Sequence, residues 1–336
     1  MARRKILPIF IPHLGCPNEC VFCDQRRISG SPLPASGAVV TEKLNEAKEQ
    51  GFRDMELAFY GGSFTAIDTT MQEELLSSAQ PFREGGTVSR LRLSTRPDAI
   101  DDGVIERLRR FGVNTVELGA QSMVDEVLYA SGRGHTAADT RRASAMLKAA
   151  GFSLILQMMT GLPEASEERD AETARQIIAL RPDGVRVYPT VIVAGTELED
   201  MWRAGTYREH TVEDAVRVCA RIVPMFEAAG IPIIRLGLNP SEELSGGGAV
   251  GGAYHPAFGE LVRSELMRCQ AAELLKDVPP GARVTLGVAP NRISAMTGQR
   301  RQNIVSLREE FSLAEVKIRP AENASGDEII LLETGR

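Results

Sequence analysis

Three cysteines stand close together near the start of the chain, in the run GCPNECVFC from 15 to 23. Cys16, Cys20 and Cys23 follow the spacing C-x3-C-x2-C, in a chain that has five cysteines in all. Thiolates hold iron–sulfur clusters, and three of them on a [4Fe–4S] cube leave one iron open to bind a small molecule. Other readings of the spacing stay open: a zinc site with His13 as the fourth ligand, and a disulfide beside a spare thiol or plain core cysteines.

The composition is that of a globular α/β protein. The chain has 336 residues, 43% of them apolar, and a net charge of -6, so it has no overall basic signature for nucleic acid, although a local patch is compatible with it. No apolar run is long enough to cross a membrane. The basic and then apolar start is interrupted by Pro8, Pro12 and His13, so we read it as a buried strand instead of a signal peptide, and expect a reducing, cytoplasmic location. Cys219 and Cys269 lie in helical patterns, where we expect small buried side chains.

Short apolar, β-rich runs alternate with helical patterns along the first two thirds of the chain. The expected strands are 5–13, 55–61, 88–95, 115–121, 153–161 and 184–190. Thr41, Asp101 and Thr136 are candidate N-caps of the intervening helices. Six β-α units with near-continuous apolar strands predict a parallel barrel or a doubly wound sheet. Polar and glycine motifs recur at the C-terminal ends of successive strands, which favours a partial (β/α)6 barrel of the TIM type, where those ends converge on one mouth.

The rest of the chain predicts a second, smaller part. A long helix at 211–230 and a strand at 231–238 complete a barrel domain of residues 1–238. A glycine-rich hinge or lid is expected at 239–256. Residues 257–336 read as helix, strand, two short helices, strand and strand, which is a small α/β domain.

Beyond the cysteines, six motifs resemble one family. They are FYGGSF (59–64), STRPDAID (94–101), VELGAQS (116–122), RGHT (133–136), MMTGLP (158–163) and YPTVIVAGTELEDMW (188–202). With the triple cysteine and the aromatic Phe22 before its last member, they resemble the radical S-adenosylmethionine (radical SAM) superfamily. Their order and spacing are similar to those of the catalytic subunit of Elongator, over about residues 5 to 215.

The resemblance implies a fold, two cofactors and a chemistry. The fold is the radical SAM barrel, and the cofactors are a [4Fe–4S] cluster on the three cysteines and S-adenosylmethionine on its open iron. Reductive cleavage of that cofactor would give a 5′-deoxyadenosyl radical that abstracts hydrogen from a substrate. An electron donor such as flavodoxin or ferredoxin is then a partner. Gly61, Gly62 and Ser63 match the motif whose backbone receives the methionine amino group; from the residues alone, they read equally well as an ordinary turn.

Four more residues match cofactor-binding positions of the family. Gln121 matches a glutamine that lines the nucleoside site, and Arg133 an arginine that neutralises the cofactor carboxylate. Gln157 stands where relatives carry His or Asp facing the ribose. Ser94 is a departure, since the relatives carry Glu there; Glu117 is a candidate to supply the missing carboxylate.

Other residues are candidates to face a substrate, while no catalytic residue is identified. His13, just before the cysteines, could bond a cluster sulfide or relay a proton, or simply be satisfied by the backbone. Tyr254 and His255, in GGAYHPAFGELV (251–262), could lie on a lid over the cofactor.

The tail offers a hypothesis about the substrate. Residues 283–320 resemble a degenerate KH module in which Gly298 keeps the first glycine of the GXXG loop and Arg301 replaces the second. Arg292, Arg300 and Arg301 would form a basic patch for RNA; the plainer reading is a small α/β cap with solvated arginines. We therefore hold three hypotheses: a radical SAM enzyme acting on RNA such as tRNA, one acting on a small molecule of the coproporphyrinogen-dehydrogenase type, and a non-catalytic RNA-binding iron–sulfur protein. No acyl-CoA phosphate loop is evident in residues 257–336, so we do not expect these residues to be a counterpart of the Elongator subunit's acetyltransferase domain.

Overall fold

The computed structural model describes residues 4–16, 20–24 and 35–335. Its contacts divide the chain into two compact units. The first consists of Met1–Ala215 and Ile222–Tyr254, and the second of Val216–Arg221 and His255–Arg336.

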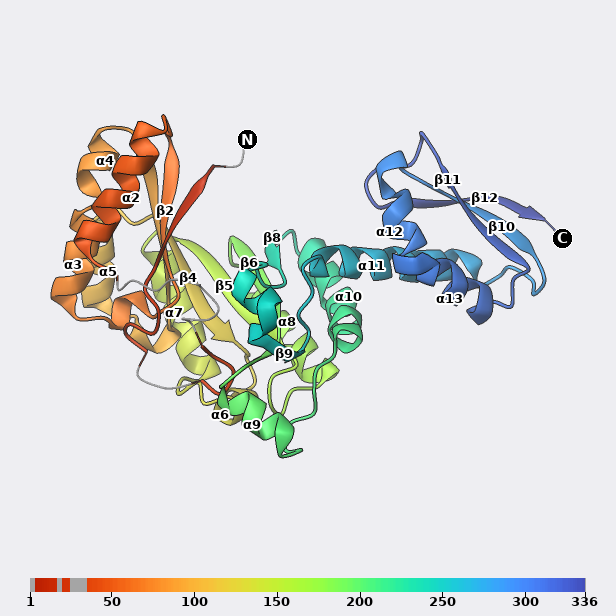
Figure 1. Cartoon of the computed structure of the whole chain (residues 1–336), viewed down its shortest axis with the longest axis horizontal. Helices are drawn as coiled ribbons and strands as arrows, with labels where there is room; N and C mark the ends of the chain where they lie inside the picture. The colour runs from red at the N-terminus through yellow and green to blue at the C-terminus, as the bar shows by residue number, and fades with distance from the viewer. Residues whose placement is uncertain (1–3, 17–19, 25–34, 336) are drawn as a thin grey trace. The chain divides into compact units, whose positions relative to one another are not determined.

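The first unit is built on a curled sheet of seven parallel strands, a half-barrel (Figure 1). The order along the sheet is β1-β2-β3-β4-β5-β6-β8. The strands are β1 (Ile6–Phe10), β2 (Met55–Tyr60), β3 (Val88–Thr95), β4 (Thr115–Gln121), β5 (Ser153–Thr160), β6 (Gly184–Pro189) and β8 (Ile233–Leu236). This sheet confirms the predicted partial barrel, with β8 added beyond the sixth unit.

Helices follow the strands, and most of them cover the outer face of the sheet (Figure 1). They are α2 (Gly37–Glu49), α3 (Thr69–Ser77), α4 (Gln80–Glu84), α5 (Asp102–Arg110), α6 (Asp125–Ala130), α7 (Ala137–Ala149), α8 (Glu167–Leu180) and α9 (Glu197–Arg203). The helix α10 (Val212–Ala228) has residues in both units.

Two of the three predicted N-caps are confirmed. Asp101 accepts from the backbone of α5, and Thr136 forms a capping box at the start of α7. Thr41 was a wrong prediction, because α2 begins earlier, at the cap Ser36. Inside that helix the Thr41 hydroxyl donates instead to the carbonyl of Gly37 at 2.9 Å.

Alternating residues of each strand face opposite sides of the sheet, so one set packs into the apolar core and the other faces the concave side. Leu57, Leu93 and Leu118 are fully buried among the apolar side chains of the core. Their strand neighbours Ser94 and Glu117 line a cavity on the concave side. Each of these strands therefore has one face packed in the apolar core and one face, with polar side chains, toward the cavity.

A small antiparallel sheet of β7 (Val191–Val193) and β9 (Ala249–Gly252) completes the first unit. It packs with Leu244, which begins a π-helical turn at Leu244–Gly248. Part of the segment 239–256, expected to be a loop, is thus a strand; its role as a lid stays a prediction.

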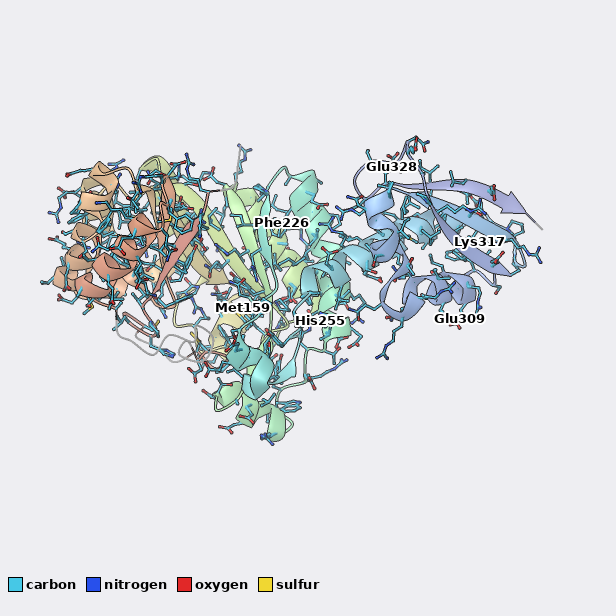
Figure 2. The ribbon with its side chains drawn as sticks, turned by 45° about the horizontal axis from the view of Figure 1, so that its top comes forward. Met159, Phe226, His255, Glu309, Lys317 and Glu328 are labelled. Carbon is cyan, nitrogen blue, oxygen red and sulfur yellow. The ribbon has the colours of Figure 1, made fainter. Side chains whose placement is uncertain are left out.

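The second unit confirms the predicted order of elements. These are α11 (Phe258–Leu275), β10 (Arg283–Val288), α12 (Ile293–Thr297), α13 (Gln302–Glu310), β11 (Glu315–Pro320) and β12 (Ile329–Gly335). β10 lies between a parallel β11 and an antiparallel β12, over its own apolar core. Charged side chains such as Glu309, Lys317 and Glu328 cover its surface (Figure 2). Across the described residues of both units, no helix has the length and hydropathy of a membrane span.

Candidate functional site

The mouth and concave face of the half-barrel enclose a cavity of about 1150 Å³. Cys16, Cys20 and Cys23 line it, together with all seven residues predicted to bind the cofactor. Those seven are Gly61, Gly62, Ser63, Ser94, Gln121, Arg133 and Gln157. The structure therefore brings the sequence-predicted residues of six chain segments to one place, while their individual roles stay predictions.

The loop that carries Cys16 packs directly on the glycine turn after β2. The amide of Ser63 donates to the carbonyl of Leu14 at 2.8 Å, and the amide of His13 donates to that of Gly61 at 3.1 Å. A Cβ on Gly62 would lie 2.6 Å from the Leu14 carbonyl oxygen, closer than packing allows. Glycine is thus required here for close approach of the cysteine loop.

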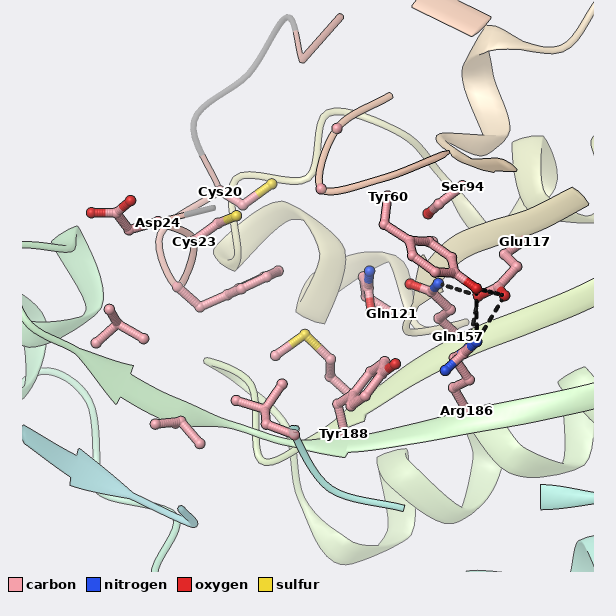
Figure 3. Close-up of a pocket in the computed structure, with 18 of the residues that line it drawn as sticks. Cys20, Cys23, Asp24, Tyr60, Ser94, Glu117, Gln121, Gln157, Arg186 and Tyr188 are labelled. Carbon is pink, nitrogen blue, oxygen red and sulfur yellow. Dashed lines mark hydrogen bonds and ion pairs between the residues drawn. The ribbon is translucent and has the colours of Figure 1, made fainter. Parts of the chain in front are cut away.

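Two apolar residues between Cys20 and Cys23 anchor the second half of the loop. Val21 and Phe22 are buried in a cluster with Leu198 and other residues of the β4–α7 and β6–α9 regions. The backbone of Val21 accepts from the amide of Leu198 at 2.7 Å. The aromatic residue before the third cysteine therefore fixes the loop to the barrel, with the flanking thiols turned toward the cavity (Figure 3).

Arg133 joins this loop to β4. Its Nη1 lies 3.1 Å from Cys20 Sγ, and its Nη2 donates to the carbonyl of Gly119 at 2.8 Å. Nearby, His135 is buried with its Nε2 3.2 Å from the carbonyl of Ala120. Burial, and then the charge of Arg133, lowers the pKa of His135 to about 4, so this imidazole is neutral at pH 7.

Gln121 ends β4 in an unusual conformation. Its φ is 61°, in the left-handed region, and the register with β5 shifts between Gly119 and Gln121. Its Oε1 is buried without a hydrogen-bond partner in the described structure. Bulges and left-handed backbone of this kind re-aim a side chain beside functional sites, and here the amide oxygen can still accept a hydrogen bond.

A network of polar side chains forms the deep wall of the cavity around Glu117 (Figure 3). Arg92 Nη1 and Arg186 Nε each donate to the Glu117 carboxylate at 2.7 Å. Gln157 Nε2 donates to it at 2.9 Å and the Tyr60 hydroxyl at 3.1 Å. Both carboxylate oxygens are thus engaged by four side chains from four other strands.

The charges in this network hold one another in their ionised forms. Burial alone would raise the pKa of Glu117, but Arg186 and Arg92 hold it below its ordinary value. Burial, reinforced by the charge of Glu117, raises the pKa of the Tyr60 phenol, which stays protonated. Arg92 also pairs with Glu56 at 2.9 Å, so two cations and two anions balance in the interior.

The network changes the interpretation of the Ser94 departure. Ser94 and Glu117 are register partners on neighbouring strands and face the same cavity. Glu117 is fully buried and its oxygens are occupied by the two guanidinium groups. Glu117 is therefore a structural ion-pair partner, and not a spare carboxylate that compensates for Ser94.

Of the three candidate substrate-facing residues, the structure places only His13 at the cavity. His13 lines the cavity with a φ of 58°, and its Nε2 lies 3.8 Å from Asp24. Tyr254 does not line the cavity in the described structure; its hydroxyl lies 2.8 Å from Ser245 Oγ. His255 belongs to the second unit, where its Nδ1 accepts from the amide of Ala257.

The three arginines that were candidates to bind RNA also differ in their surroundings. Arg292 pairs with Asp327 at 2.7 Å, a carboxylate that it shares with Arg263. Arg300 and Arg301 are exposed in the turn between α12 and α13, and both have a left-handed φ. Gly298, with a φ of 75°, begins that turn, and a Cβ there would meet Asn303. Of the two cysteines outside the cavity, Cys219 is buried as expected, but Cys269 is exposed because it lies on the outer side of α11.

Several cavity residues were missed by the sequence reasoning. Tyr60, Arg92, Arg186 and Tyr188 are near or in the polar network, yet none was a candidate. A signal was present, because polar residues recur at every second position within otherwise apolar strands. We read those strands as continuous apolar runs, which hid it.

The residues present fit an iron–sulfur cluster. Three soft sulfur donors line one side of the cavity, and the buried Oε1 of Gln121 lacks a partner beside them. No three His, Cys, Asp or Glu side chains of the described ranges meet around a point suited to one metal ion. Thiolates of a cube bind separate irons and need not meet in this way.

Comparisons with known proteins agree with the fold. The family model described as the radical SAM superfamily matches residues 10–177, and that of the radical SAM C-terminal domain matches 182–268. The archaeal Elp3 of Methanocaldococcus infernus, deleted for residues 1–46, covers 84% of this chain and 70% of its own, with a TM-score of 0.63 and 21% identity.

Curated relatives match the barrel. A tRNA uridine(34) acetyltransferase of Methanocaldococcus jannaschii is 30% identical over 49% of this chain and 34% of its own length. Elongator complex protein 3 of Mus musculus is 27% identical over 54% of this chain and 38% of its own. The chain thus spans only about a third of the length of these two relatives. The family match, which covers half of the chain, and the fold around the cavity together show that this protein is an enzyme of the radical SAM superfamily.

Proposed function

We propose that Cys16, Cys20 and Cys23 hold a [4Fe–4S] cluster and that S-adenosylmethionine binds its open iron. When bound, these groups supply a one-electron cleavage that yields methionine and a 5′-deoxyadenosyl radical, which takes a hydrogen atom from the substrate. The observation that supports the proposal is the convergence of three thiols, the glycine turn after β2 and Gln121 on one cavity. The electron comes from a low-potential donor such as flavodoxin or ferredoxin.

The chain's own groups bind and orient the cofactor in this proposal. The carbonyls of the turn Gly61–Ser63 accept from its ammonium group, with only a hydroxyl at Ser94 beside them. The unpartnered Oε1 of Gln121 accepts from the nucleoside. Arg133 and Gln157 line the same cavity and complete the polar contacts.

We further propose that the substrate is an RNA, with tRNA as the leading candidate. Two features support this: one curated relative is a tRNA uridine(34) acetyltransferase, and the pair Arg300 and Arg301 is exposed in the turn before α13. Such a pair can contact backbone phosphates, and the release of counterions would make binding fall with salt.

Anaerobic reconstitution tests the first part. Wild-type protein loaded with iron and sulfide, then given S-adenosylmethionine and dithionite, is expected to release 5′-deoxyadenosine and methionine, measured by liquid chromatography and mass spectrometry. Cys20→Ala should lose the cluster and the product. Cys269→Ala, which removes an exposed thiol of the second unit, should lose neither. A cluster that persists in Cys20→Ala contradicts the ligand assignment.

The RNA proposal is tested on the same protein. Retention of tRNA should fall in the double variant Arg300→Ala/Arg301→Ala, with a shallower salt dependence. The matched control Arg308→Ala/Arg319→Ala removes the same charge from other exposed positions of the second unit. Equal retention by both double variants contradicts a role for this turn. An unchanged set of modified tRNA nucleosides in cells that lack the protein contradicts tRNA as substrate, and favours a small molecule.

A further inference from the structure

We propose that Arg133 raises the reduction potential of the cluster through a charge-assisted hydrogen bond to the sulfur of Cys20. The inference rests on the proposed function, since it takes Cys20 as a cluster ligand. It gives Arg133 a role distinct from the carboxylate contact that the family resemblance implies. The supporting contact is that of Nη1 with Cys20 Sγ, at 3.1 Å.

The guanidinium is held in position by the barrel. Nη2 donates to the carbonyl of Gly119 on β4 at 2.8 Å. The backbone of Arg133 is tied as well: its amide donates to Leu128 at 3.0 Å, and its carbonyl accepts from Arg96 Nη2 at 2.7 Å. The residue is only 8% exposed. A side chain so constrained presents its N–H to the sulfur in one geometry, unlike a solvated surface arginine.

The direction of the effect follows from charge. Reduction adds one electron, supplied by a low-potential one-electron donor, and so adds negative charge beside a buried cation. The attraction between the added electron and the guanidinium is strong where water is excluded. Hydrogen bonds to the sulfurs also change the reduction potential of a cluster. His135, the adjacent imidazole, is neutral and adds no second positive charge at pH 7. Arg133 therefore favours the reduced form of the cluster, and it acts on the cluster through the sulfur of Cys20.

The test is a redox titration of the reconstituted full chain without S-adenosylmethionine, followed by electron paramagnetic resonance. Arg133→Met should lower the equilibrium constant for reduction at least tenfold, which is 59 mV for one electron. Arg133→Gln keeps a neutral N–H donor and should fall between Arg133→Met and wild type. The control Arg107→Met changes an arginine of α5 that donates to Gln72 and does not line the cavity, and should match wild type.

The outcomes separate the inference from the function beneath it. Wild-type potentials in the Arg133 variants, at equal iron content, overturn the inference and leave the proposed function standing. A wild-type protein that assembles no cluster overturns both. Should neither Arg133 variant load iron, wild-type protein carrying guanidino-¹⁵N arginine decides: a ¹⁵N coupling to the reduced cluster, seen by electron–nuclear double resonance, supports the hydrogen bond, and its absence overturns it.

Discussion

Replacing Glu117 by glutamine probes the polar wall of the cavity most directly. The substitution keeps the shape of the side chain and removes one charge at a fully buried position. It also places an amide N–H₂ group where Arg92 and Arg186 donate. The new amide cannot satisfy both guanidinium groups, so donors face donors and one buried cation loses its counter-charge.

The magnitude follows from the loss of a buried ion pair. Removing one partner of such a pair costs about 3–5 kcal/mol, because the remaining charge is left uncompensated in a low dielectric. Arg92 keeps Glu56 at 2.9 Å, but Arg186 depends on Glu117 through both Nε and Nη2. For a unit of this size, we expect the melting temperature to fall by roughly 6–20 °C.

Urea unfolding followed by circular dichroism, with thermal melts of the same samples, measures the effect. Glu172→Gln is the control, since Glu172 pairs with Arg175 on the exposed side of α8 and its loss should change little. Adding Arg186→Met to Glu117→Gln removes one charge of each sign and should restore much of the lost free energy. A Glu117→Gln variant as stable as the control, or a double variant that costs the sum of its parts, would refute the reasoning.

Two further substitutions give independent predictions. Burial raises the pKa of Asp170 to about 7, so the folded state keeps a proton that the unfolded state releases near 3.8. The free energy of unfolding of the wild type, relative to that of Asp170→Asn, should therefore fall by about 2–3 kcal/mol between pH 5 and pH 8 and then stay constant. A difference that does not vary with pH in urea titrations would contradict this. Gly62→Ala places a Cβ 2.4 Å from the Ile11 carbonyl oxygen and 2.6 Å from that of Leu14, so the cysteine loop must shift. The absorption band of the cluster at about 400 nm should then weaken. In the control Gly246→Ala the new Cβ meets no atom within 4 Å, and this variant should load iron as the wild type does.

Local patterns in the sequence were enough to predict the barrel and the cysteine loop. Strands and helices follow from residue periodicity and caps, which are properties of neighbouring residues, and six β-α units in series allow few folds. The N-cap prediction failed where two nearby hydroxyl residues can both cap a helix, as with Ser36, which caps α2, and Thr41, which lies inside it. The strand β9 inside a glycine-rich segment was also missed, because its pairing partner lies far along the chain.

The sequence by itself determined the presence and spacing of the thiols of Cys16, Cys20 and Cys23, and the glycines that let their loop approach β2. Only the tertiary structure decided that the carboxylate of Glu117 is paired with two arginines and that Arg133 reaches Cys20. The reason is physical. Motifs are read along the chain, whereas the partner of a buried charge is chosen across strands, where burial makes every unpaired group costly.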